Sequence, residues 1–137
     1  MDLYHWIKKV VGIAPGTYKS GTNPTSVNID RGGDNQAHGV LLELHIGAVT
    51  DDQTLTLVDG DTSTPTDAVV AADVIGGAAV LAAFKAIAGA DAGTIKTLQY
   101  TGTKRYLKVG STAAGGTGAT YGVTATLING RKGTLTS

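Results

Sequence analysis

Apolar and polar residues alternate along several short stretches of this chain, most clearly from His38 to Ile46. Side chains two residues apart point to the same side of a β-strand, so this alternation predicts a strand with one buried face. The residues expected in the core are Val40, Leu42, Leu44 and Ile46, and those expected on the opposite face are Leu41, Glu43 and His45. Residues 54–57, 105–109 and 120–129 carry the same pattern. The chain is therefore predicted to be all-β.

Turn-forming residues separate these strands. Residues 47–53 connect the strand 38–46 to the strand 54–57, and Thr101-Gly102-Thr103 connects a strand 95–100 to the strand 105–109. We predict that each of these two pairs forms an antiparallel hairpin. Short strands separated by turns about every ten residues predict a two-sheet antiparallel sandwich. The glycine-rich residues 110–118 are predicted to be a loose loop.

Residues 68–90 give conflicting signals. Alanine is abundant there and favours helix by intrinsic propensity, whereas Val69, Val70, Val74 and Ile75 favour strand. The glycine pair at 76–77 weakens any continuous helix across the segment. We expect one short strand and one helical turn in this region.

The first residues of the chain have a different, helix-like spacing. Leu3, Trp6, Ile7 and Val10 recur at intervals of three to four residues, which predicts a short amphipathic helix over residues 2–11. Residues 12–24 are dense in glycine and proline and are predicted to be a linker or extended arm. The predicted organisation is thus an N-terminal arm, 1–25, and a β-sandwich domain, 26–137.

A helix this short is not stable alone, so its apolar face needs a surface to pack on. That surface can be its own domain, another protein or, because Lys8 and Lys9 lie beside Trp6, a membrane interface. Our hypothesis is that this face docks on another protein through Leu3, Trp6, Ile7 and Val10.

The composition of the 137 residues narrows the possible partners. Charged residues make up 16% and the formal net charge is zero, so nucleic acid is not an expected partner. No segment approaches the roughly 20 apolar residues that cross a bilayer, and we recognise no export signal. We therefore expect no membrane partner and synthesis in the cytoplasm. The absence of cysteine excludes disulfides and thiolate chemistry.

Candidate catalytic and metal-binding motifs fail on their details. The loop containing Asp59, Asp61, Ser63 and Asp67 resembles a calcium loop, but Thr64 and Val70 stand where glycine and glutamate are needed. His38 and His45 have opposite parity on one strand, which argues against a shared zinc ion. Ser111 lacks the glycines of a nucleophile elbow. We predict that the protein is not an enzyme and that it binds neither a metal ion nor a cofactor.

The stretch Tyr100-Thr-Gly-Thr-Lys-Arg-Tyr-Leu-Lys-Val109 concentrates the informative side chains of the C-terminal half. Alternation places Leu107 and Val109 in the core and leaves a group of polar side chains outside: Lys104, Arg105, Tyr106 and Lys108. These residues can meet an acidic partner, with Arg105 able to bind a carboxylate through two hydrogen bonds. Alternatively, the cations keep an exposed edge strand soluble.

Three blocks in this order resemble the small capsid decoration, or cement, proteins of tailed bacteriophages: Ser26-Val-Asn-Ile-Asp-Arg31, Gly47-Ala-Val-Thr-Asp-Asp52 and Tyr100 to Val109. The resemblance covers residues 26 to about 130. Segment 2–11 has no counterpart in that pattern, and the alanine-rich stretch 78–90 is longer than expected.

The resemblance implies a jelly-roll-like sandwich that associates as a homotrimer and clamps neighbouring subunits of the major capsid protein from the outside of the head. Its location would be the virion exterior, and its role structural. The pair Asp30-Arg31 and the group Lys104-Arg105-Tyr106 carry over as matching positions for the fold or for subunit contacts. Two alternatives stay open, namely a tail or head-completion component, and a carbohydrate-binding sandwich with Tyr18, Tyr106 and Tyr121 as aromatic platforms.

Overall fold

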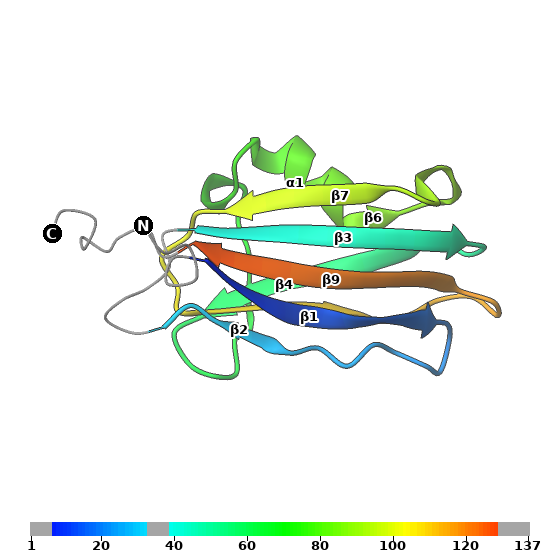
Figure 1. The fold of residues 1–137 in the computed structure, drawn as a ribbon, viewed down its shortest axis with the longest axis horizontal. Helices are drawn as coiled ribbons and strands as arrows, with labels where there is room; N and C mark the ends of the chain where they lie inside the picture. Colours follow the sequence, from blue (N-terminus) through cyan, green and yellow to red (C-terminus); the bar gives the residue numbers. More distant parts are fainter. Residues whose placement is uncertain (1–6, 33–38, 129–137) are drawn as a thin grey trace, which may run out of the picture.

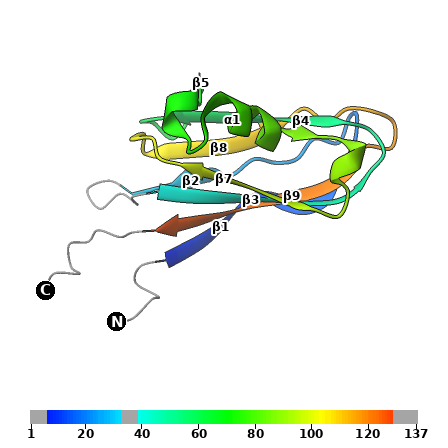
Figure 2. The ribbon, with the colours of Figure 1, turned by 90° about the horizontal axis from the view of Figure 1, so that it is seen from above.

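The computed structural model describes residues 7–32 and 39–128, and within them the chain forms two packed antiparallel sheets. Figure 1 shows the strands side by side, and Figure 2 shows the two layers from above. The prediction of an all-β antiparallel sandwich is confirmed. The elements are β1 (Ile7–Tyr18), β2 (Asn28–Asp30), β3 (Gly39–Val49), β4 (Gln53–Gly60), β5 (Asp67–Ala68), η2 (Ala71–Asp73), α1 (Gly77–Lys85), β6 (Ala86–Ile87), η3 (Gly89–Asp91), β7 (Ile95–Tyr100), β8 (Tyr106–Ser111) and β9 (Ala119–Ile128).

The chain crosses repeatedly from one layer to the other. The first sheet has the strand order β1-β9-β3-β7, and the second has the order β2-β8-β4-β5, with β6 also paired to β4. Each step from β1 to β4, and each step from β7 to β9, therefore changes sheet. Within these two runs, strands adjacent in sequence belong to opposite sheets and do not pair in a ladder, whereas β4 and β5 pair within the second sheet.

Both predicted hairpins are wrong for this reason. Strand β3 pairs with β7 and β9, whereas β4 pairs with β8, β5 and β6. Likewise β7 belongs to the first sheet and β8 to the second. Alternation shows which side chains face inward, and it is identical for two strands in one sheet and for two strands that face each other. The pattern therefore could not separate these arrangements.

The predicted core positions are buried. Val40, Leu42 and Leu44 are fully inaccessible, and Ile46 is 5% exposed. The same holds for alternate residues of β4, β8 and β9: Leu55, Leu57, Leu107, Val109, Tyr121, Val123, Ala125 and Leu127. Complete burial of a leucine or valine side chain contributes about 1.5–3 kcal/mol. The shared inner faces of the two sheets thus hold the sandwich together.

The predicted helix over residues 2–11 is wrong for residues 7–11, which begin strand β1, and residues 2–6 lie outside the described part. The predicted linker over 12–24 is likewise strand up to Tyr18. β1 pairs with β9, and its register shifts between Val11 and Ile13. The shift lets Val10 and Ile13 both pack against the core, although they are three residues apart. Of the four residues whose spacing predicts the helix, Ile7 and Val10 lie in this strand, and Leu3 and Trp6 are outside the described residues.

Residues 68–90 contain more regular structure than the predicted short strand and helical turn. The nine-residue helix α1 begins at the glycine pair: Gly76 is its N-cap and Gly77 its first residue, and both have positive φ. Leu81 and Phe84 of α1 are buried and join the core cluster. The helix lies beside β7, and it also contacts β4 (Figure 1). None of the helices among the described residues is long and apolar enough to cross a membrane.

The predicted loose loop 110–118 is instead held by specific hydrogen bonds. The carboxylate of Asp51 accepts bonds from the backbone N–H groups of Thr117 and Gly118, at 3.0 and 2.7 Å. These two donors lower the pKa of Asp51 below its usual value. Gly118 has a φ of +76°, and a Cβ atom placed there would lie 1.9 Å from the carbonyl oxygen of Tyr18. Only glycine fits this position without a backbone shift.

We predict that Gly118→Ala lowers the free energy of unfolding by about 2–4 kcal/mol, through left-handed strain and overpacking together. Gly116→Ala is the matched control, because a Cβ atom there meets nothing within 4 Å. Urea unfolding of both variants measures the difference. Equal stability of the two variants would contradict the described geometry of this loop.

Candidate partner-binding corner

The pairing of β2 with β8 gathers the predicted C-terminal site residues at one end of the sandwich. Asp30 lies opposite Tyr106, and Lys108 lies opposite Asn28. We call the group Lys104, Arg105, Tyr106 and Lys108 the cationic corner; all four side chains are partly exposed. Because β8 lies between β2 and β4, its cations do not protect a free sheet edge. The edge-strand alternative is therefore wrong for this segment.

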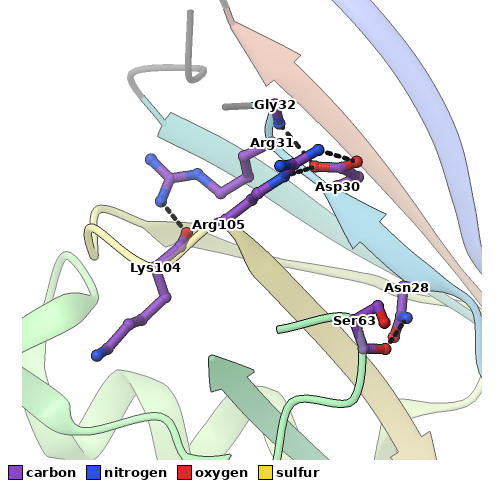
Figure 3. A network of polar contacts seen from close by, with 7 residues as sticks. All are labelled: Asn28, Asp30, Arg31, Gly32, Ser63, Lys104 and Arg105. Carbon is purple, nitrogen blue, oxygen red and sulfur yellow. Dashed lines mark hydrogen bonds and ion pairs between the residues drawn. The ribbon is translucent and has the colours of Figure 1, made fainter. Parts of the chain in front are cut away.

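An exposed ion pair ties the two strands at this corner. Arg105 donates from Nε to Asp30 Oδ1 at 2.9 Å and from Nη2 to Oδ2 at 3.1 Å. The guanidinium also lies 5.0 Å from the ring centroid of Tyr106. The pKa of Asp30 is lowered first by Arg105, then by the N–H of Gly32 at 2.8 Å, and more weakly by the charge of Lys8. Asp30 thus stays ionised and orients Arg105 (Figure 3).

Beneath this pair, a buried arginine fixes the connection between the two sheets. Arg31 is 5% exposed, and its Nη1 donates to the carbonyl oxygens of Gly102 and Lys104, each at 2.6 Å. Its backbone N–H also donates to the carbonyl oxygen of Arg105 at 2.9 Å. The connection from β7 to β8 is therefore held at three of its carbonyl groups by one residue.

The buried guanidinium has an aromatic and an acidic neighbour. Its central carbon lies 5.4 Å from the ring centroid of Tyr100, whose hydroxyl donates to Asp59 Oδ2 at 2.7 Å. Burial, and then the bond to Asp59, raise the pKa of the Tyr100 hydroxyl well above its usual value. Burial lowers the pKa of Arg31. Asp59, Tyr100 and Arg31 thus form a buried polar chain that links three strand ends.

Sequence reasoning missed this chain, although strand parity contained a signal for it. Arg31 follows the buried Ile29 by two residues, Tyr100 follows Leu98 by two, and Asp59 follows Leu57 by two. Inward parity therefore applies to three polar residues at strand ends. A polar residue at an inward position needs a partner, and three such positions indicate a shared network.

The predicted N-terminal contact residues lie in or before β1. Leu3 and Trp6 are outside the described residues, and Ile7 is paired with Ile128. Val10 is half-buried and packs against the core, so this side chain is not free to dock on a partner. Lys8, between them, is exposed and lies close enough to Asp30 to influence its pKa. The start of β1 and the cationic corner thus lie near each other.

The loop of residues 60–66 makes further polar contacts with side chains at this corner. Lys104 makes an exposed ion pair with Asp61 at 3.3 Å. The side-chain amide of Asn28 donates to the carbonyl of Ser63, as Figure 3 shows. The acidic loop 59–67 therefore serves the fold: Asp59 is used by Tyr100 and Asp61 by Lys104. Among residues 7–32 and 39–128, no group of three acidic or histidine side chains is placed to hold a metal ion.

A shallow hollow of about 320 Å³ lies at the opposite end, on the outside of the first sheet. Its lining includes Pro15, His45, Ile95, Thr120 and Gly122. A Cβ atom on Gly122 would lie 2.9 Å from Pro15, so the glycine allows β1 to fold close to β9. The hollow has no exposed aromatic platform: Tyr121 is 2% exposed, and Tyr18 packs against it with the ring centroids 5.1 Å apart and the rings tilted by 58°. Two of the three tyrosines considered for sugar binding thus serve packing.

We predict that Arg31→Met destabilises the protein by about 2–4 kcal/mol, because buried carbonyl groups and the Asp59 carboxylate lose their compensation. Arg105→Met is the matched control, since it removes an exposed ion pair that contributes about 1 kcal/mol or less. Thermal and urea unfolding report both. A smaller loss for the buried arginine than for the exposed one would contradict the assigned roles.

Asp30→Asn tests the pH dependence of the corner. The pKa of Asp30 is lower in the folded protein, so its contribution is present above the unfolded pKa and is lost as the pH falls through the folded value. The stability gap between wild type and Asp30→Asn should therefore be largest near neutral pH and shrink below about pH 4. Urea unfolding over a pH series measures this gap. A gap independent of pH would show that the ion pair does not act on stability.

Comparison with models of known protein families and with curated proteins finds no match to this chain. The function is therefore inferred from the fold and from the cationic corner.

Proposed function

We propose that this protein is a non-enzymatic structural component of a tailed-phage particle, which binds the outside of the head and stabilises contacts between major capsid subunits. The observation that carries the proposal is the strand order β1-β9-β3-β7 facing β2-β8-β4-β5. We interpret this order, with its alternation between sheets, as a jelly roll, an architecture found in viral capsid proteins and lectins.

Two of the three blocks that carry the sequence resemblance, 26–31 and 100–109, meet in space. Asp30, at the end of the first block, binds Arg105 of the third block, and Arg31 binds the carbonyl groups of Gly102 and Lys104. These contacts join residues more than 70 positions apart. Short motifs that hold a corner together are consistent with a shared fold, and they support the family proposal without any catalytic signature.

The cationic corner is suited to recognise an acidic protein surface. Arg31 fixes its backbone, and Asp30 with Tyr106 orients Arg105, so little side-chain entropy is lost on binding. Lys104 and Lys108 add charge without a buried partner of their own. In this proposal the corner sets orientation and the rate of encounter with the capsid subunit.

Many copies on one shell would multiply weak individual contacts. Symmetric attachment converts later contacts into events at high effective concentration, so one modest interface per copy is sufficient. We propose a homo-oligomer, a trimer by the resemblance, located on the virion exterior after synthesis in the host cytoplasm. The partner is the major capsid protein.

The test is binding to purified heads that lack this protein. Wild type should saturate them at near-stoichiometric copy number, measured by quantitative mass spectrometry. The double variant Lys104→Glu, Lys108→Glu should bind roughly tenfold more weakly or worse, because it reverses charge at the corner while leaving Arg31 untouched. Lys19→Glu is the control, because this exposed lysine directly follows the far end of β1 from Lys8, which lies near the corner.

Saturation at only a few copies per head would favour a tail or head-completion component and overturn the decoration role. Equal binding by the double variant and the Lys19→Glu control would overturn the assignment of the cationic corner while leaving attachment itself intact.

A further inference from the structure

The outer face of the first sheet carries exposed aliphatic side chains among its polar ones. Val11 is 45% exposed and Ile95 is 59% exposed, and Leu41 between them in the strand order is half-buried. Antiparallel sheets commonly place polar residues on the side that faces water. A regular sheet face that carries aliphatic side chains can pack against another sheet.

The edges of this sheet are unsuited to the alternative, strand-by-strand pairing with a partner. β1 contains two register shifts, Pro15 and exposed Lys8 and Lys9, all of which discourage pairing of a further strand. The C-terminal end of the β7 edge is already used, since the Ile75 N–H donates to the carbonyl of Gln99 and the Thr101 N–H donates to the carbonyl of Asp73. Association through this sheet therefore uses its face.

Two opposite charges interrupt this otherwise neutral face. Register places Thr126 of β9 between Lys9 and Leu41, and Thr124 between Val11 and Glu43. Lys9 and Glu43 are thus two strands and one cross-strand row apart, about 12 Å by ordinary strand spacing and rise. That distance is too long for an ion pair within one molecule. Neither side chain has an ion pair with any other residue in the described part of the chain.

We propose that two copies of this chain pack these faces together about a two-fold axis near Thr124 and Thr126, so that Lys9 of each copy lies against Glu43 of the other. A two-fold interface uses the same patch on both subunits, and one acid and one base on a neutral patch pair twice in such an arrangement. Threonine side chains and aliphatic groups then pack in the centre, as in face-to-face sheet packing.

The dimensions of the face set the strength of this contact. Four strands and about eight residues of length give a footprint of about 19 by 27 Å, or roughly 500 Å². A standard stable interface buries about 800 Å² per partner. The contact is therefore reversible and concentration-dependent in solution. It is strengthened where copies are already held close together, as on the shell of the proposed function.

Sedimentation equilibrium of the isolated protein tests the proposal independently of any capsid. Wild type should show a reversible doubling of its smallest species, whether that species is a monomer or a trimer. Lys9→Glu and Glu43→Lys should each weaken the doubling at least tenfold, because each brings like charges together twice. An equimolar mixture of the two variants should restore it, since every charge then faces its opposite.

The double variant Lys9→Glu, Glu43→Lys should also associate like wild type, and Lys19→Glu serves as a charge-matched control that leaves association unchanged. Thr124→Arg places a large side chain at the centre of the face and should abolish the doubling; circular dichroism checks that each variant is folded. Three outcomes overturn the proposal: no doubling of wild type at any concentration, single reversals that associate normally, or a mixture that stays dissociated.

Discussion

A guanidinium placed between two sheets is the constraint on which the cationic end of this sandwich depends. Burying the Arg31 side chain removes a charge from water, and that cost is offset only because carbonyl oxygens, a tyrosine ring and the nearby Asp59 surround it. The same bonds fix the path of the chain between β7 and β8. Arg31 therefore couples the folding of the β7–β8 connection to the placement of Lys104 and Arg105, because it binds the backbone of both residues.

Much of the fold could be predicted from the sequence, because burial follows strand parity. The inward residues of β3, β4, β8 and β9 were identified from alternation, and so was the two-sheet class. The pairing of strands could not be predicted in the same way. Leu44 and Leu55 face inward whether their strands are neighbours or lie on opposite sides of the core. Sheet membership depends on long-range packing that no local pattern records.

The errors at the N-terminus and in the candidate site have similarly local causes. The spacing of Leu3, Trp6, Ile7 and Val10 predicts a helix, but residues 7–11 pair with β9 as a strand. Arg31 was recognised only as a neighbour of Asp30, because an arginine beside a glycine turn is ordinarily exposed. Its burial depends on Tyr100 and Asp59, which come from distant strands. The exposed members of the corner were found because their parity and charge are both evident in ten consecutive residues.

The pairing of β1 with β9 joins Ile7 to Ile128, so the first and last described strands lie side by side. During synthesis on the ribosome, the first sheet therefore stays open until β9 has emerged, and β1 waits for a partner more than a hundred residues away. The same pairing brings both ends of the described chain to the end that carries the cationic corner (Figure 1). A protein displayed on this scaffold is thus better inserted in the turn at residues 20–22, where a Cβ atom on Gly21 meets nothing within 4 Å, than placed beside the start of β1 or the end of β9.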